Sequence, residues 1–227
     1  MEERLWQQSQ RGAGDGPWAS AWQVVRASLR AAADDFFTTL VVHLLWLVGN
    51  LLVIPGPPAT LALFYTAHRM ARGEVTGVSD FLHAFRRYWT PAWRWGLLNG
   101  AVVFFLAGDF WLTGRLSQAP LARFIQGFYL AALAGWLLLQ LYTLPFLFQQ
   151  EQPILRHSLR NAALMVRKHP AFTLALALLL ILVLILGTIF FLVIFAAGGV
   201  LLALIGSHAV LDRLALEGSV AKNSGSG

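Results

Sequence analysis

The feature that most constrains the fold is an apolar stretch, residues 43–73, that a cluster of three prolines interrupts. Each proline ring fixes φ and removes a backbone donor, so a helix that reaches the cluster must end, and a new helix must begin after it. Both flanks are too apolar for water, and inside a bilayer a non-helical segment survives only where protein or a water-filled cavity covers it. We therefore predict a helix over 36–54, a protected break, and a short helix over 57–71. The predicted break consists of Pro55, Gly56, Pro57 and Pro58.

The composition is that of an integral membrane protein. Hydrophobic residues make up 57% of the 227 residues and charged residues 12%, with a mean hydropathy of +0.62. A soluble domain carries about 25% charged residues. There is no cysteine, which excludes disulfides, thiol catalysis and thiolate metal ligands. The net charge of +6 does not point to nucleic acid, because the arginine clusters stand beside apolar runs, where anionic lipid headgroups attract them.

The order of predicted helices repeats three times along the chain, starting near residues 19, 79 and 154. Each repeat begins with a short amphipathic helix suited to the membrane surface, continues through a hinge at proline or aspartate, and ends with two apolar segments. We therefore predict an all-α, polytopic helical membrane protein with about six transmembrane helices, two of them short or broken, and three interfacial helices. The interfacial helices are predicted over 18–33, 79–89 and 154–168, and the transmembrane helices over 36–54, 57–71, 93–111, 124–148, 171–195 and 200–214.

The last two predicted transmembrane helices come from one apolar run that is too long for a single crossing. We place a second helix break inside this run, at Gly198 and Gly199. After each break a leucine and a histidine recur, at an offset of 140 residues. This pattern predicts a parallel pseudo-repeat about an axis along the membrane normal. The matching pairs are Leu61 with Leu201 and His68 with His208.

The positive charges determine the predicted orientation. With six crossings and a cytoplasmic N-terminus, 15 of the 17 lysines and arginines fall on the cytoplasmic side, and only Arg115 and Arg123 fall on the other. We therefore expect both termini in the cytoplasm, with a polar tail over 1–17, one transmembrane domain over 18–214, and a tail over 215–227 whose end resembles a flexible linker. Six basic residues are candidates for contact with anionic headgroups or a partner protein: Arg69, Arg72, Arg86, Arg87, Arg167 and Lys168.

Four polar residues at predicted membrane depth form a candidate polar site: His43, Asn50, Asn99 and Gln140. An ionisable residue at that depth is a functional candidate, because burying its charge is costly. The alternative is a neutral histidine that is hydrogen-bonded to a neighbouring helix, and amides that act as glue between helices. The sequence favours this structural interpretation and leaves the functional one open.

The chain contains no motif for metal binding, hydrolysis or nucleotide binding. We therefore expect no enzymatic activity, no cofactor and no metal site. The expected partners are membrane lipids and a membrane transport protein, with no nucleic acid among them.

Segments in both halves of the chain are similar to one known family. The chain resembles the YesL-like bacterial membrane proteins over roughly residues 20–214, although family members commonly have Asn where His43 stands. The resemblance implies a bacterial plasma-membrane protein of unestablished activity, often associated with carbohydrate uptake, and it supplies no catalytic residue. The similar segments are Leu44-Leu45-Trp46, 58–63, 69–74, Phe81, Phe85, Tyr88, Leu144-Pro145-Phe146, Pro153 and 159–170.

Two functions are therefore expected from the sequence. The first is a non-catalytic accessory component of solute uptake, with carbohydrate as the solute class. The alternative is a small-solute transporter or channel whose path runs between the two broken helices. A cavity at the bilayer midplane that reaches His43, Asn50 or Asn99 favours transport, and a bundle packed solid at that depth favours the accessory role.

Overall fold

The computed structural model describes residues 16–116, 119–150, 153–189 and 191–224, with 187–189, 191–198 and 217–224 described as backbone only. Within these residues every regular element is an α-helix, so the predicted all-α class is confirmed. The short helices α2, α5 and α8 correspond to the three helices predicted as interfacial. The helices are α2 (Pro17–Asp34), α3 (Phe36–Leu51), α4 (Gly56–Ala71), α5 (Val78–Arg87), α6 (Trp89–Leu116), α7 (Pro120–Phe148), α8 (Leu155–Lys168), α9 (Pro170–Ile189) and α10 (Phe191–Ser224).

The helices form three consecutive units of one plan, as the sequence predicts. Each unit has a short helix followed by two others: α2–α3–α4, α5–α6–α7 and α8–α9–α10. The third helix of each unit packs against the first helix of the next, α4 against α5 and α7 against α8, and α10 packs back against α2. The third helices α4, α7 and α10 also pack against one another. The three units therefore close into a ring whose centre is made by their third helices.

The first and third units share the same hinge between their first two helices. The bend between α2 and α3 is 96°, and the bend between α8 and α9 is 100°. The hinge residues adopt one conformation, Asp35 at φ −126° and ψ 61° and His169 at φ −126° and ψ 57°. Asp35 also caps α3, because its Oδ1 accepts a hydrogen bond from the Thr38 amide at 3.2 Å. Two segments far apart in the sequence thus carry the same local structure.

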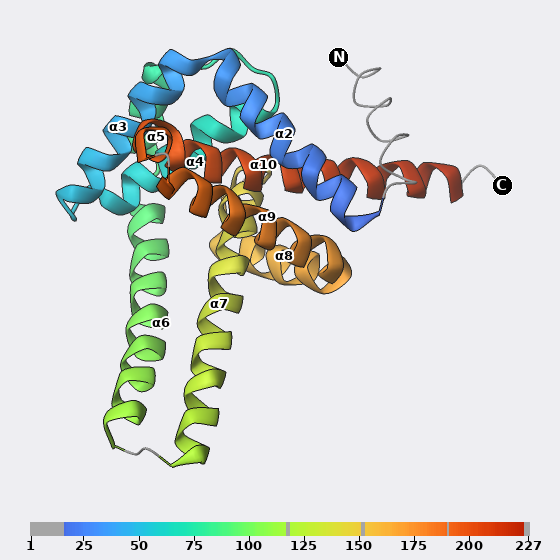
Figure 1. The fold of residues 1–227 in the computed structure, drawn as a ribbon. Coiled ribbons are helices and arrows are strands. Elements are labelled where there is room, and N and C mark those ends of the chain that lie inside the picture. The colour runs from blue at the N-terminus through green and yellow to red at the C-terminus, as the bar shows by residue number, and fades with distance from the viewer. Residues whose placement is uncertain (1–15, 117–118, 151–152, 190, 225–227) are drawn as a thin grey trace.

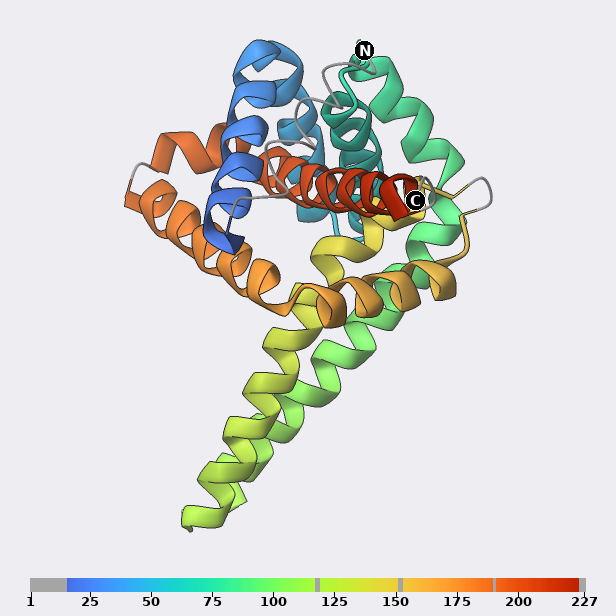
Figure 2. The same ribbon diagram turned by 90° about the vertical axis from the view of Figure 1, so that its right-hand side faces the viewer.

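The α6–α7 hairpin projects from the other helices, which form a compact head (Figures 1 and 2). Three described segments, in α6, α7 and α10, are long and apolar enough to cross a membrane, and two more crossings result if each bent pair counts as one. Length and composition therefore do not support the expected six crossings. The predicted crossing that is missing is α4, which has only 16 residues and is too short. The structure supports three to five candidate crossings.

The predicted second helix break is wrong. Gly198 and Gly199 lie inside α10, which runs unbroken over Phe191–Ser224, and α9 ends earlier, at Ile189. Gly199 is adjacent to another helix, since a Cβ at this position would lie 2.9 Å from Trp46 Cε3 and 3.0 Å from His43 Nδ1. A glycine in a helix interior costs about 1 kcal/mol relative to alanine. Here the missing side chain permits a close approach between helices, and the glycine does not end the helix.

Candidate functional site

The proline break between α3 and α4 is confirmed. Helix α3 ends at Leu51 and α4 begins at Gly56, with Pro57 and Pro58 in its first turn, where the missing amides have no intrahelical acceptor to lose. In the connecting turn Val53 has a φ of +62°, and its carbonyl accepts a hydrogen bond from the Gly56 amide at 3.0 Å. A β-branched residue in this left-handed region costs about 1–3 kcal/mol. Because the Val53 side chain is 72% exposed, the turn must be held by its backbone hydrogen bonds and by the contacts of the flanking helices.

Two glycines clamp the break between neighbouring helices. A Cβ on Gly49 of α3 would lie 2.6 Å from the Ala59 Cβ of α4, and a Cβ on Gly96 of α6 would lie 2.7 Å from Pro57 Cγ. Both distances are shorter than any ordinary carbon contact, so the helices come this close only because the residues are glycine. These two contacts fix the helices that flank the break, whereas the turn itself faces outward, with Leu52, Val53 and Ile54 62–72% exposed.

An open groove of about 700 Å³ lies between this break and the first half of α6. It contains two of the four polar residues predicted as a site, Asn50 and Asn99, and the hydroxyl-bearing Thr60. His43 and Gln140 do not line it. The remaining lining is apolar, aromatic or glycine: Val53, Gly56, Pro57, Trp93, Trp95, Gly96, Leu97, Gly100, Ala101, Phe104 and Phe105.

His43 is packed between α3 and α10 and is only 2% exposed. Its Nδ1 accepts a hydrogen bond from the Gly199 amide at 3.1 Å, so the proton of the neutral ring is on Nε2. Trp46 lies beside it, with ring centroids 5.4 Å apart, and donates from Nε1 to Thr60 Oγ1 at 3.1 Å. This is the neutral, hydrogen-bonded histidine that the sequence favours. His43 thus joins α3 to α10, and its neighbour Trp46 joins α3 to α4.

The amides Asn99 and Gln140 connect the two helices of the hairpin. Trp95 Nε1 donates to Gln140 Oε1 at 3.0 Å, and Trp136 Nε1 donates to Asn99 Oδ1 at 3.0 Å. Each bond joins α6 to α7, so these residues act as glue between helices. The sequence identified the amides but not the indoles that bind them, because pairs 37 and 45 residues apart leave no local signal. Asn50 instead donates to the carbonyl oxygen of its own helix at Trp46, at 2.9 Å.

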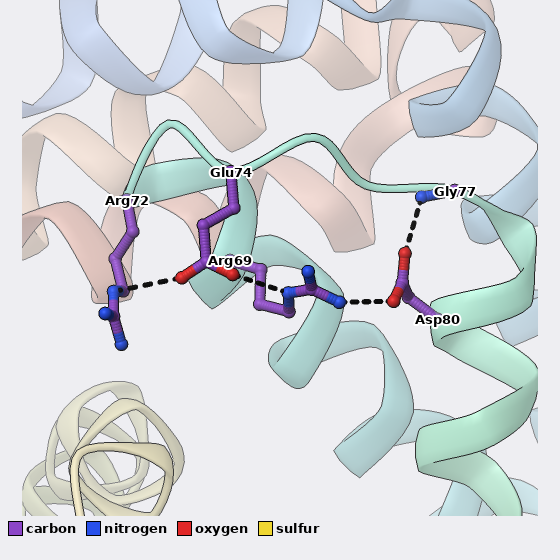
Figure 3. Close-up of polar contacts among 5 residues, drawn as sticks. All are labelled: Arg69, Arg72, Glu74, Gly77 and Asp80. Carbon is purple, nitrogen blue, oxygen red and sulfur yellow. Dashed lines mark hydrogen bonds and ion pairs between the residues drawn. The ribbon is translucent and has the colours of Figure 1, made fainter.

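Charged residues tie the end of α4 to the start of α5 (Figure 3). Arg69 Nε lies 2.7 Å from Glu74 Oε2, and the same guanidinium pairs with Asp80. Glu74 Oε1 also lies 3.2 Å from Arg72 Nε. Asp80 Oδ2 accepts a hydrogen bond from the Gly77 amide at 2.9 Å. Arg69 is thereby held inside the protein's own charge network. Headgroup or partner contact by the other predicted basic residues, Arg72, Arg86, Arg87, Arg167 and Lys168, stays a prediction.

The two histidines that the sequence places at equivalent positions lie on helices that pack together, α4 and α10. His68 is 2% exposed, and neither ring nitrogen has a hydrogen-bond partner in the described residues. His208 Nδ1 lies 3.2 Å from Ser28 Oγ and 3.1 Å from the Leu204 carbonyl oxygen. No group of three or more His, Cys, Asp or Glu in the described part of the chain could hold a metal ion.

One family model matches part of the chain. A family model described as "Protein of unknown function, DUF624" matches residues 39–110, which extend from α3 into α6. This segment includes every residue that lines the groove. No curated protein and no solved structure matches the chain.

Proposed function

We propose that this chain is a non-catalytic, multi-pass protein of the bacterial plasma membrane, related to the YesL-like proteins, with both termini in the cytoplasm. Its proposed role is that of an accessory component of solute uptake, with carbohydrate as the solute and a membrane transport protein as the partner. The solute class and the bacterial origin depend on the family resemblance. The accessory role is supported by the hydrogen bonds of the polar side chains, which join helices to one another.

The observation that carries the proposal is the packing around His43. This ring is 2% exposed, accepts a hydrogen bond from Gly199 at 3.1 Å, and lies against Trp46, so it is used in helix packing and is not open to a solute in this conformation. Asn99 and Gln140 are likewise engaged by indole donors across the hairpin. A transport site needs polar groups that are left available to the solute, whereas these groups hold helices together.

The outer surface of the hairpin supports a role that depends on neighbours in the membrane. Ala92 is the one buried residue of the 28 in α6. Phe104 is 73% exposed and Trp111 60% exposed, both on this helix. An apolar surface of this kind is covered by lipid or by another membrane protein.

One observation favours the alternative, a small-solute transporter or channel. The groove beside the proline break reaches two polar side chains, Asn50 and Asn99, although the Gly56 and Ala59 amides at the start of α4 already donate to Val53 and Pro55. Two features weaken this alternative. The groove is open along its length, and the second broken helix that would form the other wall of a path is the continuous helix α10.

The test combines a reconstituted and a cellular measurement. The purified protein in liposomes is expected to move no labelled sugar above the rate of protein-free liposomes, while deleting its gene is expected to lower sugar uptake by the host cells. Sugar uptake by the protein alone would contradict the accessory role and establish transport. In that event Asn99→Leu, which alters the groove, would lower the rate, and Gly135→Ala on the outer face of α7 would not. If the deletion strain takes up every tested sugar at the wild-type rate, the proposed role in sugar uptake is contradicted.

A further inference from the structure

Helix α5 presents a basic face to the outside of the protein. It buries Phe81 and Ala84 against the head, and its opposite side lines a shallow depression of about 520 Å³. The residues of that side follow one another at helical spacing, three or four positions apart, and all are exposed. We name this surface the basic face of α5; it consists of Ser79, Leu82, His83, Arg86 and Arg87.

No carboxylate neutralises this face in the described structure. Glu74 and Asp80, the acidic residues nearest in sequence, are both paired with Arg69, and Asp80 also binds the Gly77 amide (Figure 3). Neither arginine of the basic face has an ion pair among the described residues, and Arg87 Cζ lies 5.8 Å from the centre of the Tyr88 ring. Arg69 therefore neutralises the nearby carboxylates, and the basic face keeps its net positive charge.

The position of α5 places this face next to an apolar crossing segment. Helix α6 begins at Trp89, two residues after α5 ends, and Trp93 follows one turn later. Tryptophans near the end of a crossing helix mark the headgroup level of a bilayer. Leu82, 44% exposed, stands among the cations of the face. A surface that combines exposed cations with an exposed apolar side chain is suited to the boundary between headgroups and acyl chains.

We propose that the basic face of α5 binds the phosphate group of anionic phospholipids. Arg86 and Arg87 both line the depression, and each guanidinium group has N–H donors that phosphate oxygens accept, while Ser79 of the same lining adds a hydroxyl donor. Leu82 contacts the glycerol and upper acyl region of the same lipid. The inference goes beyond the proposed function, since lipid binding by the purified protein requires neither a solute nor a transport partner.

The test is lipid binding measured by native mass spectrometry on the full chain in detergent. Phosphatidylglycerol and phosphatidylcholine with the same acyl chains are titrated separately. The wild type is expected to bind phosphatidylglycerol more tightly than phosphatidylcholine. The double variant Arg86→Gln/Arg87→Gln is expected to bind phosphatidylglycerol roughly thirtyfold more weakly than the wild type does, a factor of about five for each arginine. Its affinity for phosphatidylcholine is expected to stay unchanged. Inorganic phosphate in excess over the lipid is expected to leave the lipid bound.

The matched control is Arg115→Gln/Arg123→Gln, which removes the same charge at the tip of the hairpin. It is expected to keep the wild-type affinity for phosphatidylglycerol. If the α5 variant fails to fold, Arg86→Lys/Arg87→Lys retains the charge and is expected to retain the preference. The proposal is overturned if the glutamine variant binds like the wild type, if the tip variant loses as much affinity, or if the lysine variant shows no preference. Displacement of the lipid by inorganic phosphate would identify a site for free phosphate instead.

Discussion

Replacing Gly206 by alanine tests the contact between the third helices of the second and third units. Gly206 lies in α10, and a Cβ at this position would lie 2.5 Å from the Leu141 carbonyl oxygen of α7 and 3.4 Å from Pro145 Cγ. Pro145 has no amide hydrogen, so the Leu141 carbonyl lacks the helical donor that it would otherwise have. The two helices approach at the one turn of α7 where proline has changed the backbone.

The expected cost follows from two opposing terms. Overpacking a tightly packed interior typically costs about 1–3 kcal/mol, and alanine recovers about 1 kcal/mol because glycine is a poor helix former. The obstacle at Gly206 is a backbone oxygen, which cannot rotate away as the end of a side chain can, so the cost lies at the upper end of the range. We expect Gly206→Ala to lower the free energy of unfolding by about 2 kcal/mol and the Tm by about 4–8 °C.

Thermal unfolding in detergent, followed by the fluorescence of the nine tryptophans, measures this difference. The matched control is Gly135→Ala, also inside a long helix, where a Cβ would meet nothing within 4 Å. It is expected to keep or raise the Tm. If Gly206→Ala unfolds at the wild-type temperature while the control behaves as expected, then α7 and α10 are not in contact at Gly206, and the reasoning is refuted.

Three further substitutions test the polar contacts. Arg69→Gln removes both ion pairs of Arg69 at the start of α5. It is expected to lower the free energy of unfolding by about 1 kcal/mol and the Tm by about 2–4 °C. An unchanged Tm at low salt would contradict a role for these pairs in stability. His43→Leu removes the acceptor for the Gly199 amide and is expected to cost about 1–2 kcal/mol, whereas His43→Gln, which retains an acceptor, is expected to cost less. Trp136→Phe removes the donor to Asn99 and is expected to cost about 0.6–1.7 kcal/mol in the same unfolding assay, and a stability equal to that of the wild type would show that the bond contributes nothing.

The parts of the fold that could be predicted from the sequence are those with local causes. Three prolines within four residues end a helix in any context, so the break between α3 and α4 was predictable. The repeated order of a short amphipathic helix and two apolar helices follows from hydrophobic periodicity, which is also local. The glycine pair in α10 was misread because glycine has two opposite uses. It can end a helix, or it can admit a neighbouring helix, and only the partner across the contact distinguishes the two.

The site could be predicted only in part, because its partners come from distant segments. The histidine at position 43 has an obvious reason to need a partner, but nothing in the sequence names Gly199, 156 residues away, as that partner. The groove likewise depends on Gly96 meeting Pro57. Such contacts are set by the way whole helices pack, and a sequence without aligned relatives contains no record of that packing.

The ring of three units explains why the hairpin is the best candidate for a membrane crossing. The third helices pack on one another at the centre, and α4 buries 11 of its 16 residues. Helix α6, the second helix of its unit, has 28 residues and is about 42 Å long. It therefore extends beyond the head, and it is longer than the ~30 Å of a hydrocarbon core. Helix α10 runs across the hairpin in both views (Figures 1 and 2), and 56% of its apolar segment is buried inside the protein. In a bilayer crossed along the hairpin, α10 would run parallel to the membrane surface, so this helix counts as a crossing by length and composition but not by its direction relative to the hairpin.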